Sequence, residues 1–567
     1  MKTLGLGDKG VTTYFSSNCT DNDAKLVADF MQSKRIEFYN TRCFKTESKS
    51  GDIHSEYEIR LASTTSQENP NVLSEEEIFK KSKFKVTRGD YDIILSSVVE
   101  NLELAKEHAA NDMEVSMIQK YIEHFTSGCS EDHKNACRSW IKNKSPDVET
   151  FIGFLESYRD PAGQRGEFEA FVGIVDRQMS DKFAVLVDGA QKFISTLPWG
   201  KDFEKDKFLM PDFTSLDILM WSSSIIPSGK TVPNYSEMRQ SEGFKNLSLG
   251  NVIFANIKQD TIPFLSESDQ ELMNKYQVAS FEIQVGLHEL LGHGSGKLLR
   301  KLDDGSFNFD STLKNPVTGE PVTNYYVGGE TYNTVFGPLS SPFEECKAEA
   351  VGLYLSLNKD IVKIFGFEGR EAEDIVYVNW LSLFWGGFAK ALEMYQPSSG
   401  KWLQAHSQAR YVLLRVCLEA GQDFVKVVET EPGKNLRLTL DRGKLHTVGK
   451  SAIGDFLLKL QVFKSTADLK SAKEMFDRYS EVPEFGSHPW AKWRDVIMSQ
   501  RRPRKIFVQP NTFIDDSGAV IFKNYEPNFE GFIESWTDRF PSPKVSDALI
   551  ELYERDAKFF LLPNAEC

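Results

Sequence analysis

Two histidines and the glutamate between them are the residues of this chain whose types and spacing most clearly indicate chemistry. Residues 281–299 read FEIQVGLHELLGHGSGKLL, which places His288, Glu289 and His293 within six positions. In zinc peptidases, two histidines of one helix hold the ion, and the glutamate beside the first histidine activates water. The segment therefore predicts a zinc site with Glu289 as the general base.

The spacing between the two histidines is one residue longer than in the common His-Glu-x-x-His pattern. At about 100° per residue, an offset of five positions separates the rings by roughly 140°, against roughly 40° for an offset of four. A regular helix cannot direct both rings at one ion, so we predict a π-type bulge around Leu291–Gly292, where glycine tolerates distortion. The alternative is a chance match in a chain with nine histidines.

A catalytic zinc site takes a third protein ligand and leaves one position for water. Residues 343–353 read FEECKAEAVGL, so Glu345 and Glu349 lie four apart on one helix face. One is expected to bind zinc, and the other to accept a hydrogen bond from a ligating histidine. Taken alone, the segment is typical of a solvated helix face, but after a His-Glu-His motif the metal interpretation is favoured. His406, four residues before Arg410, is by itself more typical of a surface histidine.

The elements that must position these residues are mainly helical. We predict a long loop over 304–331, which is rich in Gly, Asn, Pro and Thr. The apolar periodicity predicts helices over 91–104, 170–186, 374–394 and 545–560, and short strands over 35–39, 57–61, 504–510 and 520–522. The sequence thus indicates an α+β fold, with a large helical body and a smaller β-containing part made from both ends of the chain.

The bulk composition limits the class of partner. The 567 residues are 40% hydrophobic and 26% charged, with a net charge of −15, which disfavours nucleic acid or an anionic membrane as the main partner. The chain begins without a signal-peptide pattern and contains no apolar run of about 18 residues. Its seven cysteines are sparse and lack CxxC spacing, so we expect free thiols and a cytoplasmic location, with Cys417 in the core.

The motif HELLGH followed by EECKAE resembles the dipeptidyl peptidase III family, zinc exopeptidases that remove dipeptides from the N-termini of short peptides. The resemblance extends from LGLGDKGVTTYFSSNCT to RKIFVQPNT and beyond. It implies two lobes with a wide cleft, a mainly helical zinc-bearing lobe and a smaller mixed lobe with a β-barrel. On that pattern the smaller, lower lobe takes 1–176, 215–258 and 504–544, and the helical lobe takes 177–214, 259–503 (with the zinc site) and 545–567.

The same resemblance implies roles for individual residues. One Zn²⁺ per chain is bound by His288, His293 and Glu345, with Glu289 as catalytic base and with Glu344 and Glu349 hydrogen-bonded to the ligands. The segment GFLESYRDP resembles the family's substrate clamp, in which Glu156 pairs the substrate ammonium and Tyr158 contacts the scissile carbonyl. The remaining implied substrate contacts are Asn234 at the ammonium, His406 at the transition state, Arg410, and Arg504 and Lys505 at the far end of the peptide. Such a clamp fixes the distance from the N-terminus to the cleaved bond, and strand addition to the β lobe reads backbone more than side chains.

Three departures from the family pattern qualify these expectations. Thr231 stands first in Thr-Val-Pro-Asn, where the family has Asn-x-Pro-Asn. Val317 stands first in Val-Thr-Gly-Glu, where some members have Glu-Thr-Gly-Glu and bind a Kelch-repeat adaptor, so that partnership is not expected here. Members also carry a substantial stretch before the point where this chain begins. The alternative function is therefore a shortened, weakly active form with an incomplete barrel that binds zinc and peptides; an endopeptidase is a third hypothesis.

Overall fold

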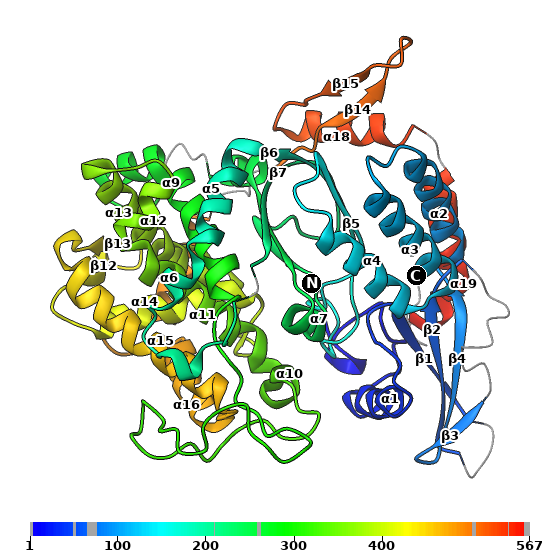
Figure 1. Cartoon of the computed structure of the whole chain (residues 1–567), viewed down its shortest axis with the longest axis horizontal. Coiled ribbons are helices and arrows are strands. Elements are labelled where there is room, and N and C mark those ends of the chain that lie inside the picture. Colours follow the sequence, from blue (N-terminus) through cyan, green and yellow to red (C-terminus); the bar gives the residue numbers. More distant parts are fainter. Residues whose placement is uncertain are drawn as a thin grey trace.

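Three separate clusters of buried apolar side chains underlie the fold. The computed structural model describes residues 4–48, 53–64, 76–208, 210–257, 262–501, 506–541 and 544–560. The largest core draws its residues from between Phe183 and Ile497, the second from between Ala62 and Val252, and the third from between Leu6 and Val86. The expected α+β class is confirmed, and the structure is two-lobed in Figure 1, with helices of the largest core on one side of a central sheet.

The central sheet is a curled half-barrel of five strands. Its order is β5 (Val148–Phe154), β6 (Phe168–Asp176), β7 (Asp212–Ser222), β9 (Lys245–Leu249) and β8 (Gly229–Val232). The β7–β9 pair is parallel and the other pairs are antiparallel. Because β8 comes last in the strand order, it lies at an edge of the sheet. One face of the sheet is covered by α2 (Asp92–Glu107), α3 (Asp112–Ser127) and α4 (Ser130–Lys142), through contacts such as Trp140 against Phe151.

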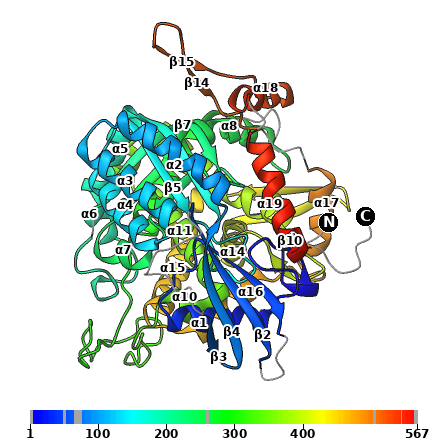
Figure 2. The same ribbon diagram turned by 90° about the vertical axis from the view of Figure 1, so that its right-hand side faces the viewer.

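A second sheet of four strands packs against α1 (Asp21–Ser33). Its order is β1 (Thr41–Glu47), β2 (Ser55–Ala62), β4 (Ser82–Asp90) and β3 (Glu77–Phe79). The C-terminal helix α19 (Lys544–Phe560) lies beside α2 and this sheet, as Figure 2 shows, and its Asp556 contacts Arg42 at 2.5 Å and Arg60 at 3.0 Å. For this helix the contacts favour the β-containing part over the helical lobe expected for 545–567.

The helical lobe is built around five long helices that enclose the largest core. They are α9 (Glu267–Leu287), α11 (Ser340–Ser356), α13 (Gly369–Trp385), α14 (Ala405–Glu419) and α15 (Lys450–Ser465). The remaining α-helices of the described residues, in either lobe, are shorter. They are α5 (Arg177–Asp188), α6 (Ala190–Ile194), α7 (Ser236–Ser241), α8 (Gly250–Ile257), α10 (Tyr332–Phe336), α12 (Lys359–Ile364), α16 (Leu469–Ser480), α17 (Trp490–Ser499) and α18 (Phe529–Arg539). Two-stranded hairpins are β10 (Tyr395–Gln396) with β11 (Lys401–Trp402), β12 (Val425–Glu431) with β13 (Asn435–Leu440), and β14 (Asn511–Ile514) with β15 (Val520–Lys523).

Several predicted elements are confirmed and others are wrong. The helices over 91–104 and 545–560, the strands over 57–61 and 520–522, and the loop over 304–331 are present. The helix predicted over 374–394 continues α13 as a π-helix over Gly386–Lys390 and a 3₁₀ turn to Met394. The helix predicted over 170–186 is confirmed only from Arg177, where α5 begins; its first part is wrong, because 170–176 belong to β6, which pairs with strands on both sides. Residues 35–39 and 506–510 form no strand, and Arg504 and Lys505 lie outside the described residues.

Two expectations from the composition concern the cysteines and membrane-spanning segments. The six cysteines in the described ranges are free thiols, and Cys417 is fully buried as predicted. Among the described residues, every helix is too short or too polar to span a lipid bilayer.

Candidate active site

The helix that carries the two histidines is bulged as predicted. α9 ends at Leu287, and His288–Gly292 form a π-helix (η3), in which the amide of His293 donates to the carbonyl of His288 at 3.1 Å. This bond spans five residues, so one extra residue is accommodated in the turn and the rings face a common side. Gly292 serves a further purpose, because a Cβ there would lie 2.7 Å from Ala348 Cα of α11. A glycine is therefore needed for the close approach of η3 to α11.

Three imidazole rings converge on one carboxylate oxygen. Glu345 Oε2 lies 3.2 Å from His288 Nε2, 3.6 Å from His293 Nε2 and 3.1 Å from His406 Nε2. Within the described residues, His288, Glu345 and His406 are the group whose ligand atoms all lie within 4.8 Å of one another. His406 of α14 therefore belongs to the cluster, although its sequence context alone was more typical of a surface histidine.

The unpaired oxygen of Glu345 tests whether a metal fits. This atom is buried and makes no hydrogen bond, although three ring nitrogens surround it. Burying a carboxylate oxygen without a partner is costly, and a cation would satisfy it. Neutral imidazole nitrogens and a carboxylate oxygen are also the donors that zinc prefers. The residues present therefore fit a zinc ion.

The outer nitrogens of the two motif histidines face the two expected glutamates. His293 Nδ1 is 3.3 Å from Glu344 Oε1, and His288 Nδ1 is 3.6 Å from Glu349 Oε2. Carboxylates in these positions fix the orientation of the rings and raise their basicity as ligands. This pairing gives each glutamate of the helix α11 a distinct partner.

A cation beside each of the two glutamates favours its ionised form. One of these cations, Lys464, was not predicted, and the other, Arg410, was expected to contact substrate. Burial opposes ionisation of Glu344, but the ammonium of Lys464, which hydrogen-bonds to it, lowers the pKa of Glu344 well below its usual range. Burial likewise opposes ionisation of Glu349, and the Arg410 guanidinium, with Nε at 2.6 Å, lowers the pKa of that carboxyl. Gln284 donates to Glu349 Oε2 at 2.9 Å, and its position four residues before His288 could have revealed it. Lys464 carries no such signal.

The expected general base contacts the other lobe. Glu289 is buried, and its Oε2 accepts a hydrogen bond from the hydroxyl of Thr231 in β8. A Cβ at Gly229, at the start of the same strand, would lie 3.1 Å from Glu289 Oε1 and 2.7 Å from a methyl of Val285. The edge strand of the sheet therefore packs directly on the helix that carries the two histidines.

The expected clamp lies in the loop after β5. Glu156 Oε1 is 2.8 Å from Lys230 Nζ, and Asn234 donates to the Leu155 carbonyl at 3.0 Å. Tyr158 is 62% exposed, and the carboxylate of Glu156, together with the charges of Glu345 and Glu289, raises its pKa above the usual range. The Tyr158 hydroxyl consequently lies in the field of both the clamp and the metal cluster. Lys230 was not predicted, because a single lysine in a strand carries no spacing signal.

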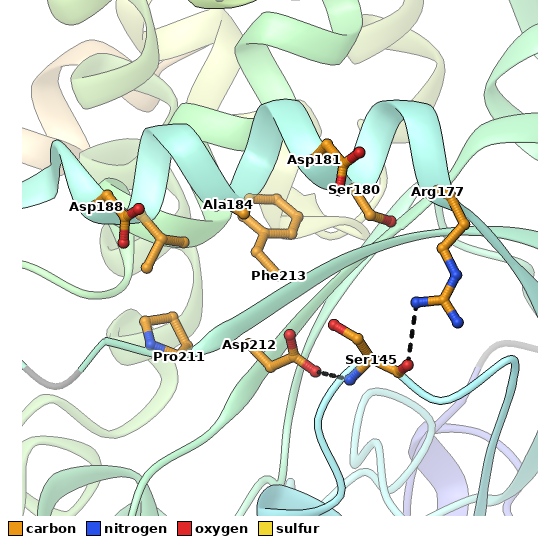
Figure 3. A pocket seen from close by; sticks show the side chains of 10 residues that line it. Ser145, Arg177, Ser180, Asp181, Ala184, Asp188, Pro211, Asp212 and Phe213 are labelled. Carbon is orange, nitrogen blue, oxygen red and sulfur yellow. Dashed lines mark hydrogen bonds between the residues drawn. The ribbon is translucent and has the colours of Figure 1, made fainter.

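A separate depression lies elsewhere on the surface. Figure 3 shows it between α5 and the start of β7, with a volume of about 140 Å³. Arg177 donates to the Ser145 carbonyl at 3.2 Å, and the Ser145 amide donates to Asp212 at 3.0 Å. None of the predicted site residues lines this depression, so it takes no part in the cluster.

Comparisons with known proteins agree in one family. A sequence model described as Peptidase family M49 matches residues 1–540. The chain is 48% identical over 569 residues to a protein named Dipeptidyl peptidase 3 of Nematostella vectensis, which covers 98% of this chain and 76% of that one. It is 46% identical over 578 residues to the protein of the same name of Homo sapiens, covering 100% and 78% of the two chains. The solved structure of DPP III from Caldithrix abyssi matches with a TM-score of 0.59 at 17% identity, over 86% of this chain and 78% of that one, and this likeness concerns the fold alone.

Proposed function

The chain belongs to peptidase family M49, and we propose that it releases dipeptides from the N-termini of oligopeptides with one zinc ion bound per chain. The family and the relatives named Dipeptidyl peptidase 3 make it a dipeptidyl peptidase that acts on peptides. The alternative of a weakly active binding form is not favoured.

The observation that carries the zinc proposal is the unpaired Glu345 Oε2 with imidazole nitrogens 3.1 to 3.6 Å away. We assign His288, His293 and Glu345 as ligands and leave His406 for the substrate, because a catalytic zinc site keeps one open position. When bound, zinc supplies a Lewis acid that polarises a carbonyl and lowers the pKa of water. Glu344 and Glu349 keep the two histidine rings in orientation.

The protein groups around the metal site then divide the proton transfers and the charge stabilisation. Glu289 removes a proton from the attacking water and delivers it to the leaving amine, with Thr231 holding its carboxylate in place. Tyr158 donates a hydrogen bond to the scissile carbonyl oxygen, and His406 stabilises the negative charge that develops there.

The position of cleavage follows from how the N-terminus of the substrate peptide is held. Glu156 pairs the substrate ammonium and Asn234 assists it, so the scissile bond two residues further on reaches the metal site. The peptide backbone adds to the edge of the sheet at β8, and the two lobes close on it. We assign Arg504 and Lys505 to bind the far end of the peptide, and Arg410 contacts the peptide from its place beside Glu349. The division into lobes along the predicted boundaries remains part of this proposal, except that α19 is assigned to the β-containing part with which its Asp556 pairs.

Two further inferences concern where and with whom the protein acts. The sparse free thiols support a cytoplasmic location. Val317 packs against the core of the helical lobe, which supports the inference that this loop does not bind a Kelch-repeat adaptor.

The test is release of dipeptide from Arg-Arg-2-naphthylamide by the purified chain, with and without a metal chelator. We expect chelator-sensitive release that returns on adding zinc. In Glu289→Gln, turnover should fall by several orders of magnitude while zinc stays bound, since the amide cannot take a proton. A folded wild-type sample without chelator-sensitive release would refute the proposal. Equal cleavage of free and N-acetylated peptides would instead indicate an endopeptidase and remove Glu156 as a clamp.

A further inference from the structure

A buried lysine in the edge strand bridges two glutamates beside the proposed clamp. Lys230 Nζ lies 2.8 Å from Glu156 Oε1 and also hydrogen-bonds to Glu169 Oε1 of β6. The Lys230 and Glu169 side chains are 5% and 4% exposed, whereas that of Glu156 is 24% exposed. Glu156 is therefore the member of this cluster that a ligand can reach.

The cluster carries one net negative charge, from two carboxylates and one ammonium. Burial opposes ionisation of Glu156, but Lys230 lowers the pKa of that carboxyl, and the two glutamates together raise the pKa of Lys230 against its own burial. Burial raises the pKa of Glu169, and Arg239 also lowers the pKa of Glu156, but Lys230 is the cation in contact with both carboxylates. A carboxylate charge without a full partner in a poorly solvated place is costly, so the cluster favours one further monovalent cation.

The cluster also lies next to the reaction site. Thr231, the residue after Lys230, hydrogen-bonds to Glu289, and successive side chains of a strand point to opposite faces. β8 thus presents Thr231 to the general base and Lys230 to the clamp. Tyr158, two residues after Glu156, lies in the field of Glu156, Glu345 and Glu289 together.

We propose that Lys230 is a positioning residue that sets the charge of the ammonium site: by sharing its own charge with Glu169, it leaves one negative charge for a single α-ammonium. The ligand class is peptides with a free, protonated N-terminal amine. This inference rests on the proposed function, in which Glu156 receives the substrate N-terminus. It assigns to the buried Glu169 a part in affinity, although Glu169 itself does not contact the peptide.

The test measures binding of tetra-alanine and of N-acetyl-tetra-alanine by calorimetry, in the zinc-loaded Glu289→Gln background so that nothing is cleaved. Adding Glu169→Gln keeps the side-chain shape and an acceptor for Lys230, but makes the cluster neutral. We expect tetra-alanine to bind about tenfold more weakly, or about 1.4 kcal/mol, with no change for the acetylated peptide. The double change Glu169→Gln with Lys230→Met restores one negative charge and should restore affinity to within about threefold of the parent.

A matched control exists in the same sheet. Glu149 and Lys245 form another buried pair, with Oε2 and Nζ 2.9 Å apart and side chains at most 1% exposed. Glu149→Gln makes the same chemical change away from the clamp and should leave tetra-alanine binding unaltered. A general loss of rigidity in the sheet would affect both variants alike.

The outcomes separate the inference from the function on which it rests. Unchanged tetra-alanine binding in Glu169→Gln, or a double variant as weak as Glu169→Gln alone, would overturn the role of Lys230. If Glu169→Gln does not fold, Lys230→Met alone decides, because it removes only positive charge; more than threefold weaker binding would contradict the proposal. A wild-type chain that binds tetra-alanine with this charge dependence, yet shows no chelator-sensitive release of dipeptide, would overturn the proposed function and leave the charge assignment standing.

Discussion

Replacing Gly292 by alanine tests whether the close approach of η3 to α11 sets the affinity for zinc. A Cβ at residue 292 would lie 2.7 Å from Ala348 Cα, 2.8 Å from its Cβ and 3.1 Å from its carbonyl oxygen. Ordinary contacts begin at 3.4 Å, so α11 would have to withdraw by about 0.7 Å at this point. Because the obstructing atoms are backbone or fixed to it, no side-chain rotation can relieve the clash.

The withdrawal separates the groups that we assign to zinc. α11 carries Glu345, whereas His288 and His293 lie at the two ends of the π-helical turn. Zinc–ligand distances vary by only about 0.2 Å, so a shift of about 0.7 Å is not absorbed within the coordination sphere. We expect zinc affinity to fall by about 10- to 100-fold, the size seen when groups that orient ligands are lost. The overpacking itself should lower the free energy of unfolding by about 1–3 kcal/mol.

The assay is competition for zinc against a chromophoric chelator, together with the melting temperature of the metal-free protein. Gly329→Ala is the matched control, because Gly329 is exposed in a loop and its Cβ would have no neighbour within 4 Å. The control should bind zinc within about twofold of the wild type. A Gly292→Ala variant that binds zinc equally well would refute the reasoning, since the helices would then separate without disturbing the ligands.

Three further predictions follow from the contacts of the site and of the C-terminal helix. Thr231→Val removes a hydrogen bond to the buried Glu289 carboxylate, so kcat/KM should fall about tenfold in a dipeptidyl-arylamide assay, with Thr231→Ser restoring it; a fully active valine variant would contradict this role. Zinc removal should lower the melting temperature, because zinc at 100 times its Kd adds about 2.7 kcal/mol to the folded state; an unchanged melting curve would indicate no resident metal. Asp556→Asn should lower the free energy of unfolding by about 2 kcal/mol at pH 7, because burial opposes ionisation of Asp556 but Arg555 and Arg42 lower its pKa to about 2. Since this folded-state pKa is depressed, the stabilisation is complete above about pH 4 and is lost as the pH falls through 2. Urea unfolding should therefore show the full difference between wild type and variant at pH 7 and a much smaller one near pH 2.

The bulged helix could be predicted from sequence because its cause is local. Two histidines five positions apart that must share one ion leave a π-type turn as the way to bring the rings together, and His288–Gly292 adopt it. The sequence likewise placed Glu345 and Glu349 on one helix face, and Glu349 is the one that faces a histidine ring. The place of Glu344 was implied by the family resemblance. The helices over 91–104 and 545–560 were found for the same reason, since their apolar spacing is a property of the segment itself.

The segment over 170–186 shows where local periodicity fails. Its apolar residues fit a helix, but the first seven belong to β6, between β5 and β7. Residues 170–175 read AFVGIV, a short run without polar alternation, and such a run does not by itself distinguish a strand from a helix. Which of the two forms depends on strands supplied by residues 148–154 and 212–222.

The sequence by itself determined the bulged helix and the family, and it predicted the kind of metal site. The tertiary structure decided that His406 faces Glu345, that Thr231 holds Glu289, and that Lys230 lies between Glu156 and Glu169. Each of these contacts joins residues at least 58 positions apart. Spacing along the chain carries no information at that range, because the packing of β8 against η3, and of α14 against α11, brings these groups together only after folding.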